Sequence, residues 1–368
     1  MARARYVMIG GFLGAGKTTA MLRFGQYLAA QGLRVGLVTN DQSSGLADTA
    51  LLSASGLAVE EITGGCFCCR FNSLMEAAER LTQRTTPDVF LAEPVGSCTD
   101  LKATVSYPLR RMYGDNFSVA PFSVLLDPSR ALRVLGLEEG RRFSEKVSYV
   151  YTKQLEEADV LVINKIDEVH ADRVAALRAA LSERYPHARL FEVSATSGAG
   201  LEPWFSSALG PEDEGRANLD IDYDEYADGE ALLGWVNGTA RIAGAPFDGN
   251  DWLTGLATRL QRQLRGLAIE IAHLKMTLAP AEHDNDLCVV NVVGSESQTV
   301  TAFRLQAPVD EGDLILNLRA EGDPDILRRE AMSALTDHAA EAGLNVAIEH
   351  IEHFRPGRPV PTHRVVMA

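Results

Sequence analysis

Residues Gly11–Thr18 read GFLGAGKT and satisfy the pattern G-x-x-x-x-G-K-[ST]. The stretch follows the apolar run YVMIG and opens an amphipathic segment with helical spacing. In this strand–loop–helix context, glycines let backbone N–H groups surround a phosphate, and the N-terminus of the helix adds its positive end. The sequence therefore predicts a phosphate-binding loop that holds a nucleoside triphosphate.

Each part of this loop has an expected role. Lys17 would reach the β- and γ-phosphate oxygens, and Thr18 would place its hydroxyl on Mg²⁺. The alternative is a glycine-rich turn with a chance lysine, and strand, motif and helix together argue against it. The expected nucleotide-binding residues here are Gly11, Gly14, Ala15, Gly16, Lys17, Thr18 and Thr19.

The first 210 residues alternate apolar, strand-like runs with amphipathic, helix-like segments. The apolar runs are RYVMIG, VGLVTN, DVFLAE, FSVLLD, ADVLVINK and RLFEVSA. Apolar strands separated by helices indicate an α/β fold, here a P-loop NTPase, whose mostly parallel sheet is covered on both faces. Because ligands bind beyond the C-terminal ends of such strands, polar residues at those ends are the candidates for chemistry.

The pattern predicts three parts of the chain. Residues 1–210 form the P-loop domain, and residues 211–230 form an acidic linker with no helical or strand period, which we expect to be solvated. Residues 231–368 contain five strand-like runs and two helix-like segments, which indicates a smaller α+β domain at the C-terminus.

A second nucleotide motif follows the run ADVLVINK. Asn164, Lys165 and Asp167 form N-K-x-D, in which Asp167 would accept from guanine N1–H and the exocyclic amine. Adenine lacks that donor pair and would leave the carboxylate unpaired, at a cost of about 1–3 kcal/mol. Asn164 would reach the other polar edge of the ring and stiffen the loop, and the Lys165 stem would cover the base. The backbone N–H groups of Ser194 and Ala195 would donate to guanine O6, so we predict GTP and GDP as ligands.

Two carboxylates are candidates for hydrolysis. Glu93 ends the run DVFLAE, where it would hold Mg²⁺ together with Thr18 or orient the attacking water. Asp41 follows the run VGLVTN and is either a second catalytic carboxylate or a turn cap. The expected catalytic residues are Lys17, Glu93 and Asp41.

Three of the five cysteines crowd into GGCFCCR, from Gly64 to Arg70. Thiolates of Cys66, Cys68 and Cys69 are soft ligands suited to Zn²⁺, Co²⁺, Ni²⁺ or Cu⁺. Cys69 would point away from the other two unless the chain bends, which the paired glycines allow. Buried small apolar side chains are the alternative interpretation. Cys98 could add a ligand, although a core position is favoured, and ordinary core or surface roles are expected for the histidines.

Four motifs in this order, GGFLGAGKTT, GGCFCC, the E-x-x-G of Glu93–Gly96 and NKID, resemble the CobW-like GTPases, relatives of HypB and UreG. The resemblance covers residues 1–210. It implies slow GTP hydrolysis and a transition metal, Zn²⁺ or Co²⁺, bound at the cysteines and delivered to a client metalloprotein or metallocofactor enzyme. It also implies client binding by the C-terminal domain and a GTP-dependent homodimer.

Charge and composition limit the partners. The net charge of −15 disfavours nucleic acid and anionic lipid, and no apolar stretch approaches the ~20 residues of a membrane span. Few cysteines and no predicted signal peptide point to the cytoplasm. The main alternative function is a regulatory GTPase with structural or redox-sensing cysteines and a protein-binding second domain. A nucleotide kinase is disfavoured by the guanine-type loop.

Overall fold

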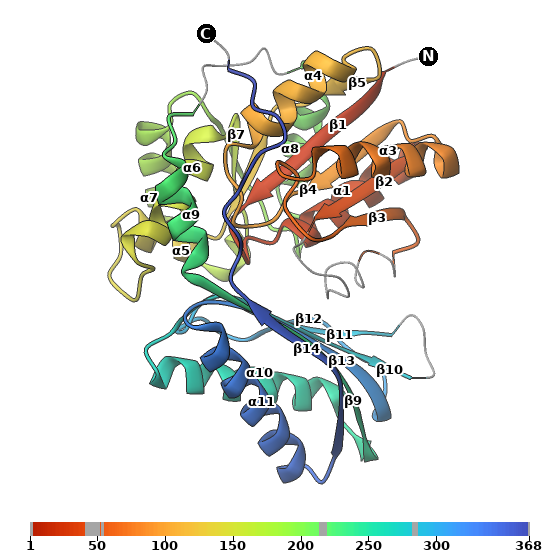
Figure 1. The fold of residues 1–368 in the computed structure, drawn as a ribbon, viewed down its shortest axis with the longest axis vertical. Helices are drawn as coiled ribbons and strands as arrows, with labels where there is room; N and C mark the ends of the chain where they lie inside the picture. The colour runs from red at the N-terminus through yellow and green to blue at the C-terminus, as the bar shows by residue number, and fades with distance from the viewer. Residues whose placement is uncertain (1–2, 41–51, 53–54, 213–218, 282–285, 367–368) are drawn as a thin grey trace.

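The computed structural model describes residues 3–40, 52, 55–212, 219–281 and 286–366. Two sheet-containing units lie one against the other (Figure 1). The first carries a parallel sheet between helices, and the second carries an antiparallel sheet with helices on its far side. None of the helices in the described residues is both long and apolar enough to cross a bilayer.

Eight strands of the described chain form the first sheet, and every pairing between them is parallel. The order is β3-β2-β4-β1-β6-β7-β8, with β5 beside β1. This confirms the predicted fold class. The strands are β1 Ala4–Gly11, β2 Val35–Asn40, β3 Ala58–Ile62, β4 Val89–Glu93, β5 Phe117–Val119, β6 Ser123–Leu126, β7 Val160–Ile163 and β8 Arg189–Glu192.

Helices cover both faces of this sheet because alternate residues of each strand face opposite sides. In β1, Tyr6 and Met8 join one apolar cluster, and Val7 and Ile9 join another. The helices are α1 Lys17–Ala30, α3 Phe71–Thr85, α4 Tyr107–Tyr113, α5 Pro128–Val134, α6 Glu145–Glu157, α7 Ala171–Arg184 and α8 Leu201–Leu209, with a π-helical turn at Lys102–Ser106 and a 3₁₀ turn at Ile166–Glu168.

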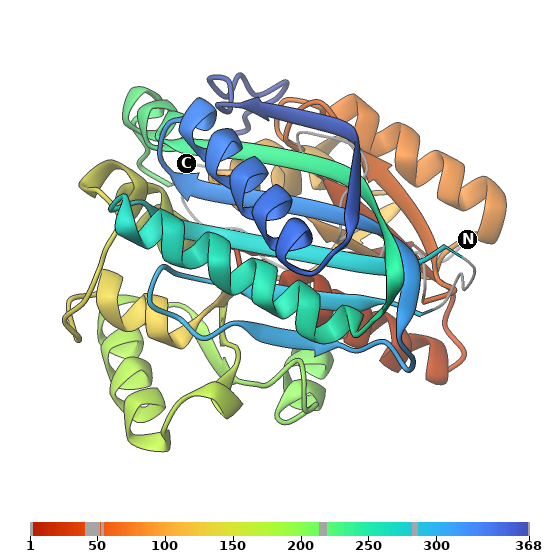
Figure 2. The same ribbon diagram turned by 90° about the horizontal axis from the view of Figure 1, so that it is seen from below.

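The second sheet is antiparallel, in the order β12-β11-β10-β13-β9-β14. Its strands are β9 Leu233–Phe247, β10 Glu270–Pro280, β11 Cys288–Val292, β12 Val300–Phe303, β13 Val309–Glu321 and β14 Asn345–Phe354. Strand β9 is absent from the predicted set, although it lies between β13 and β14. Helices α10 Gly249–Gly266 and α11 Pro324–Glu341 cross one face of this sheet (Figure 2).

The two faces of this second sheet differ in polarity. Leu274, Met276 and Leu278 of β10 pack in the apolar cluster that includes the helices. The intervening residues His273 and Lys275 point to the opposite face and line a pocket together with residues of the first domain. The polar face of the sheet therefore faces the first domain rather than solvent.

The acidic segment between the domains is a helix in its last part, contrary to the expected irregular linker. Helix α9 spans Tyr223–Ala231, and the side chain of Asp222 caps its first turn. Tyr226 and Glu230 are fully buried, four residues apart and hence on one face of the helix. The acidic composition concealed this buried stripe.

One buried cation joins the two domains. Arg130 of α5 is 4% exposed and donates to the carbonyl of Leu13 in the P-loop. The same guanidinium donates to the carbonyls of Ala272 (2.6 Å) and Val293 (2.9 Å), which belong to the second domain. The rings of Phe12 and Phe143 lie 5.4 Å from it on the first-domain side. Arg130 thus fixes the P-loop against the second sheet.

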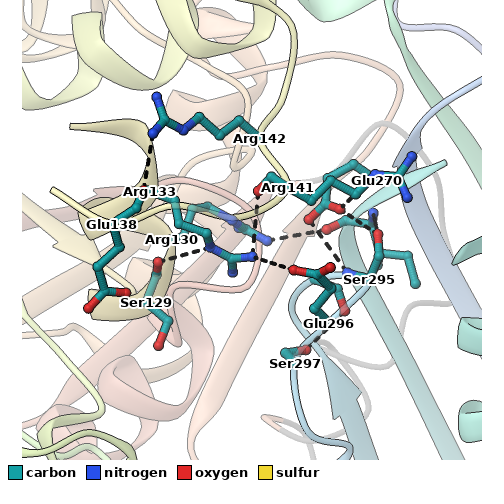
Figure 3. A network of polar contacts seen from close by, with 12 residues as sticks. Ser129, Arg130, Arg133, Glu138, Arg141, Arg142, Glu270, Ser295, Glu296 and Ser297 are labelled. Carbon is teal, nitrogen blue, oxygen red and sulfur yellow. Dashed lines mark hydrogen bonds and ion pairs between the residues drawn. The ribbon is translucent and has the colours of Figure 1, made fainter. Parts of the chain in front are cut away.

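An outer layer of ion pairs surrounds this contact (Figure 3). Arg133 approaches Glu296 at 3.9 Å, and Arg141 approaches Glu270 at 3.7 Å. Ser295 also donates through its hydroxyl to the Glu270 carboxylate. Glu296 is half exposed, so its pair with Arg133 is expected to add little stability.

We predict that Arg130→Ala lowers the free energy of unfolding by ~3 kcal/mol or more, because buried carbonyls on both domains lose their donor. Arg133→Ala, on the same helix, should cost less, because its carboxylate partner Glu296 is half exposed. Urea unfolding followed by circular dichroism measures both. Equal losses of unfolding free energy in the two variants would contradict the conclusion that Arg130 fixes the P-loop against the second sheet.

Candidate functional site

The P-loop connects β1 to α1 in a conformation that requires its glycines. Gly11 and Gly16 have φ angles of +130° and +90°, in the region that favours glycine. A Cβ at Gly11 would overlap the Leu125 carbonyl, and one at Gly16 would overlap the Asn164 amide. Lys17 and Thr18 are buried in the first turn of α1. The loop is therefore a tight turn that requires glycine at both positions, and phosphate binding there stays a prediction.

Glu93 lies beside the P-loop at the end of β4. The Thr18 hydroxyl donates to a Glu93 carboxylate oxygen at 3.2 Å, and the Lys17 ammonium is 3.8 Å from the same oxygen. A hydroxyl and a carboxylate are hard oxygen ligands of the kind that Mg²⁺ takes, so the pair fits the expected magnesium site. Asp41, the other predicted catalytic carboxylate, lies outside the described residues.

Asn164 connects three parts of the nucleotide site. Its side-chain amide donates to the Ala15 carbonyl at 2.9 Å and accepts from the Ala195 N–H at 3.0 Å. Lys165 pairs with Asp127 at 3.0 Å, and Asp167 is exposed on the following 3₁₀ turn. Asn164 thus stiffens the predicted base-binding loop, as expected, but both ends of its amide are already engaged within the protein.

The expected contacts from Ser194 and Ala195 to guanine O6 are not available in this structure. The Ser194 N–H donates to the Ala199 carbonyl at 2.9 Å, and the Ala195 N–H donates to Asn164. The physical reason is the tight turn here, in which Gly198 N–H also returns to the Ser194 carbonyl. Ala195 still lines the pocket, next to Thr196.

A pocket extends from the P-loop to this turn, and part of its wall comes from the second domain. First-domain residues at the pocket include Lys17, Thr18, Glu93, Asn164 and Lys165. The second-domain residues are His273, Lys275, Asn291, Val293, Val300 and Ala302. Sequence reasoning missed these residues. The signal that could have found them is the alternation in AIEIAHLKMTL, which places His273 and Lys275 on one face of a strand.

The three clustered cysteines converge. Their sulfur atoms are 2.7 Å apart for Cys66 and Cys68, 3.3 Å for Cys66 and Cys69, and 3.7 Å for Cys68 and Cys69. The chain bends as the paired glycines allow, because Cys69 N–H and Arg70 N–H both return to the Cys66 carbonyl. Among the described residues, this is the one group of three or more His, Cys, Asp and Glu side chains placed closely enough to share a metal.

The thiols share hydrogen bonds that favour one thiolate. Hydrogen bonds from Cys68, Cys69 and Cys98 hold the pKa of Cys66 well below its usual value. The same bond to Cys66 raises the pKa of Cys68 well above its usual value. Cys98 is buried and takes part in this network, so it belongs to the surroundings of the cluster rather than to a distant part of the core.

Asn40 connects the nucleotide pocket to the cysteine loop, residues Gly64–Arg70. It ends β2 and lines the pocket. Its side-chain amide donates to the carbonyl of Ile62 (3.0 Å), which ends β3, and to that of Gly65 (2.7 Å), which directly precedes Cys66. One residue, Asn40, thus lines the nucleotide pocket and is hydrogen-bonded to the loop that carries the cysteines.

The C-terminal tail, residues 355–366, covers the other side of the cysteine loop. It leaves β14 and runs back along the first domain (Figure 1, dark blue). Val360 N–H donates to the Cys69 sulfur at 3.2 Å, and Thr362 N–H donates to the Cys68 carbonyl at 2.8 Å. Arg364 then pairs with buried Asp100 at 2.7 Å. Sequence reasoning missed this contact.

Helix α9 closes the cysteine loop from a further side. Buried Glu230 accepts from the Ser97 hydroxyl at 2.6 Å. Burial, followed by the charge on Cys66, raises the pKa of Glu230 well above its usual value. Tyr226 lies nearby and accepts from Thr99 N–H at 3.3 Å. The cysteine loop is therefore enclosed by elements from distant parts of the chain.

Comparison with known proteins finds a family that matches more than half of the chain. Residues 5–192, just over half of the chain, match the family described as CobW/HypB/UreG, nucleotide-binding domain. The zinc chaperone YeiR of Escherichia coli (strain K12) is 31% identical over 172 residues, which are 46% of this chain and 49% of that protein. The zinc chaperone CobW of a Sinorhizobium species is 28% identical over 198 residues, which are 48% of this chain and 55% of that protein.

These alignments span about half the length of each relative. Among solved structures, the Zn(II)-bound YjiA GTPase from E. coli aligns with a TM-score of 0.40 at 14% identity, over 92% of this chain and 99% of that one.

We predict that Arg364→Ala increases the rate at which a thiol reagent such as DTNB modifies Cys69, because the tail loses its ion pair with Asp100. Arg358→Ala is the matched control, since Arg358 precedes the cysteine contacts of the tail and pairs with exposed Asp224. Modification sites are assigned by mass spectrometry. The account of the tail is contradicted if Arg364→Ala and the control react at the wild-type rate.

Proposed function

The chain belongs to the CobW/HypB/UreG family, and from that premise we propose that it is a GTP-hydrolysing metallochaperone. It binds a transition metal through Cys66, Cys68 and Cys69 and delivers it to a client metalloprotein or metallocofactor enzyme. The observation that carries this proposal is Asn40, whose side chain joins the nucleotide pocket to the carbonyl before the first cysteine.

The coupling follows from the position of Asn40. It is buried at the end of β2, and β2 pairs with β3, which leads into the cysteine loop. A change at the nucleotide pocket that moves Asn40 therefore also moves Gly65 and the thiol of the next residue, Cys66. Such a link lets two bound states of the nucleotide favour two geometries of the thiols, which is what controlled release of a metal requires.

The donor set favours Zn²⁺ as cargo, with Co²⁺ as the other candidate. Three converging thiols supply soft ligands and leave coordination positions for a ligand from a client. Two similar proteins are named zinc chaperones, which supports zinc by analogy. The second domain is the proposed client-binding part, also by analogy.

GTP is the proposed substrate. Asp167 stands exposed next to the stiffened Asn164 loop, so its carboxylate is accessible to guanine. Mg²⁺, when bound, would neutralise phosphate charge between Thr18 and Glu93, and Lys17 would hold the β- and γ-phosphate oxygens. Glu93 would in addition orient the water that attacks the γ-phosphate.

A redox-sensing GTPase is the second candidate function. It is favoured by the separation of 2.7 Å between the Cys66 and Cys68 sulfur atoms and by the hydrogen bonds that stabilise a Cys66 thiolate. In that case the cysteines would control GTP turnover through oxidation and would not hold a stoichiometric metal.

We expect the zinc affinity of the wild-type protein to differ by about tenfold or more between GDP and a non-hydrolysable GTP analogue, each with Mg²⁺, a coupling of ~1.4 kcal/mol. Competition with a chromophoric chelator measures it under reducing conditions. Asn40→Ala should reduce the difference while leaving the protein folded.

The triple variant Cys66→Ser, Cys68→Ser, Cys69→Ser should lose stoichiometric zinc, whereas Cys288→Ser, a buried cysteine of the second domain, should retain it. Equal zinc affinities in both nucleotide states would refute gating. Zinc retained by the triple variant would refute the proposed metal site and favour the redox alternative.

A further inference from the structure

The second domain presents a polar strip to the nucleotide pocket. On β10, His273 and Lys275 face the pocket, and on β11 Asn291 stands opposite Lys275 in the strand register. The His273 ring is hydrogen-bonded to the Asn291 side chain at 3.1 Å. Antiparallel sheets commonly turn such a polar face to water, but here it closes the mouth of a pocket.

The strip lies directly against the P-loop. A Cβ at Gly14 would overlap the Val293 side chain and lie 3.3 Å from the Ala272 carbonyl. Arg130 holds these two second-domain segments to the Leu13 carbonyl. From Ala272, β10 continues beneath the first domain from the side of α5 toward the side of β3 (Figures 1 and 2). Residues after Ala272 on β10 are thereby placed along the nucleotide pocket.

Lys275 is the cation of this strip. Its side chain is only 5% exposed, and it shares the pocket with Lys17, Thr18 and Glu93, the residues expected at the phosphates and Mg²⁺. A triphosphate brings more negative charge than Lys17 and one Mg²⁺ neutralise, so a second ammonium at this position has an electrostatic use.

We propose that the second domain completes the nucleotide site and that the Lys275 ammonium contacts the phosphates of the nucleotide held by the P-loop. The inference rests on the proposed function, because it requires GTP at Gly11–Thr18. It assigns to β10 and β11 a direct role in sensing the nucleotide from within the same chain. A partner subunit docking face to face over this pocket would have to displace these strands.

A purely structural role for Lys275, filling the contact between the domains, predicts a different result. It would change stability without changing the preference for GTP over GDP. The ratio of the two affinities therefore separates the interpretations, because both affinities are measured on the same folded protein.

The test compares Lys275→Met, which keeps the apolar stem, with Lys275→Gln, which keeps a polar end, and Lys275→Arg, which keeps the charge. Affinities for fluorescent GTP and GDP analogues with Mg²⁺ and steady-state kcat and KM are measured at fixed ionic strength. Lys146→Met is the matched control, because Lys146 is an exposed lysine paired with Asp228 on the surface. Circular dichroism and urea midpoints verify folding.

We expect Lys275→Met and Lys275→Gln to weaken GTP binding about tenfold or more and GDP binding less, whereas Lys275→Arg recovers part of the loss. Wild-type affinities, kcat and GTP-to-GDP ratio in both uncharged variants would overturn the inference. Lys17→Ala identifies the cause of a negative result. If Lys17→Ala abolishes GTP binding but Lys275 variants do not weaken it, only the inference falls; if the wild type binds no GTP, the proposed function falls with it.

Discussion

The position of the P-loop depends on the hydrogen bonds of one buried guanidinium. Arg130 donates to carbonyls of Leu13, Ala272 and Val293, so the loop and the second sheet are satisfied by the same side chain. Asp127 caps α5 by accepting from Arg130 N–H and also pairs with Lys165. Although burial alone would raise the pKa of Asp127, the charges of Lys165 and Arg130 lower it. One short helix therefore links the predicted base-binding loop, the P-loop and the second domain.

The cysteine loop is held in a similar way, by hydrogen bonds to residues that lie far from it in the sequence. Asn40 holds the loop from the nucleotide side, and Thr362 of the tail holds it from the opposite side. Glu230 of α9 accepts from Ser97, and its pKa is raised by burial and then by the charge on nearby Cys66. The thiols consequently sit where the start of the chain, the inter-domain helix and the C-terminal tail meet, so their geometry depends on the arrangement of both domains.

The sequence predicted the first domain well because parallel strands place their polar ends at one edge, where Thr18, Glu93 and Asn164 indeed meet. It failed where the local pattern opposed the tertiary environment. The acidic α9 resembled a solvated linker. Tyr226 and Glu230 are recognised as buried only once the helix is seen packed against the first domain. The alternation of His273 and Lys275 resembled an ordinary half-exposed strand. The tail has no periodicity at all, so its contacts with the cysteines left no signal.

Residues of both domains line the nucleotide pocket, and the second domain is proposed to contact the bound nucleotide. Hydrogen–deuterium exchange of the full chain, with Mg²⁺ and either GDP or a non-hydrolysable GTP analogue, tests this contact most directly. The expected result is that the analogue slows exchange in the P-loop and also in strands β10 (Glu270–Pro280) and β11 (Cys288–Val292), more than GDP does. Protection confined to residues 1–210 in both nucleotide states would contradict it.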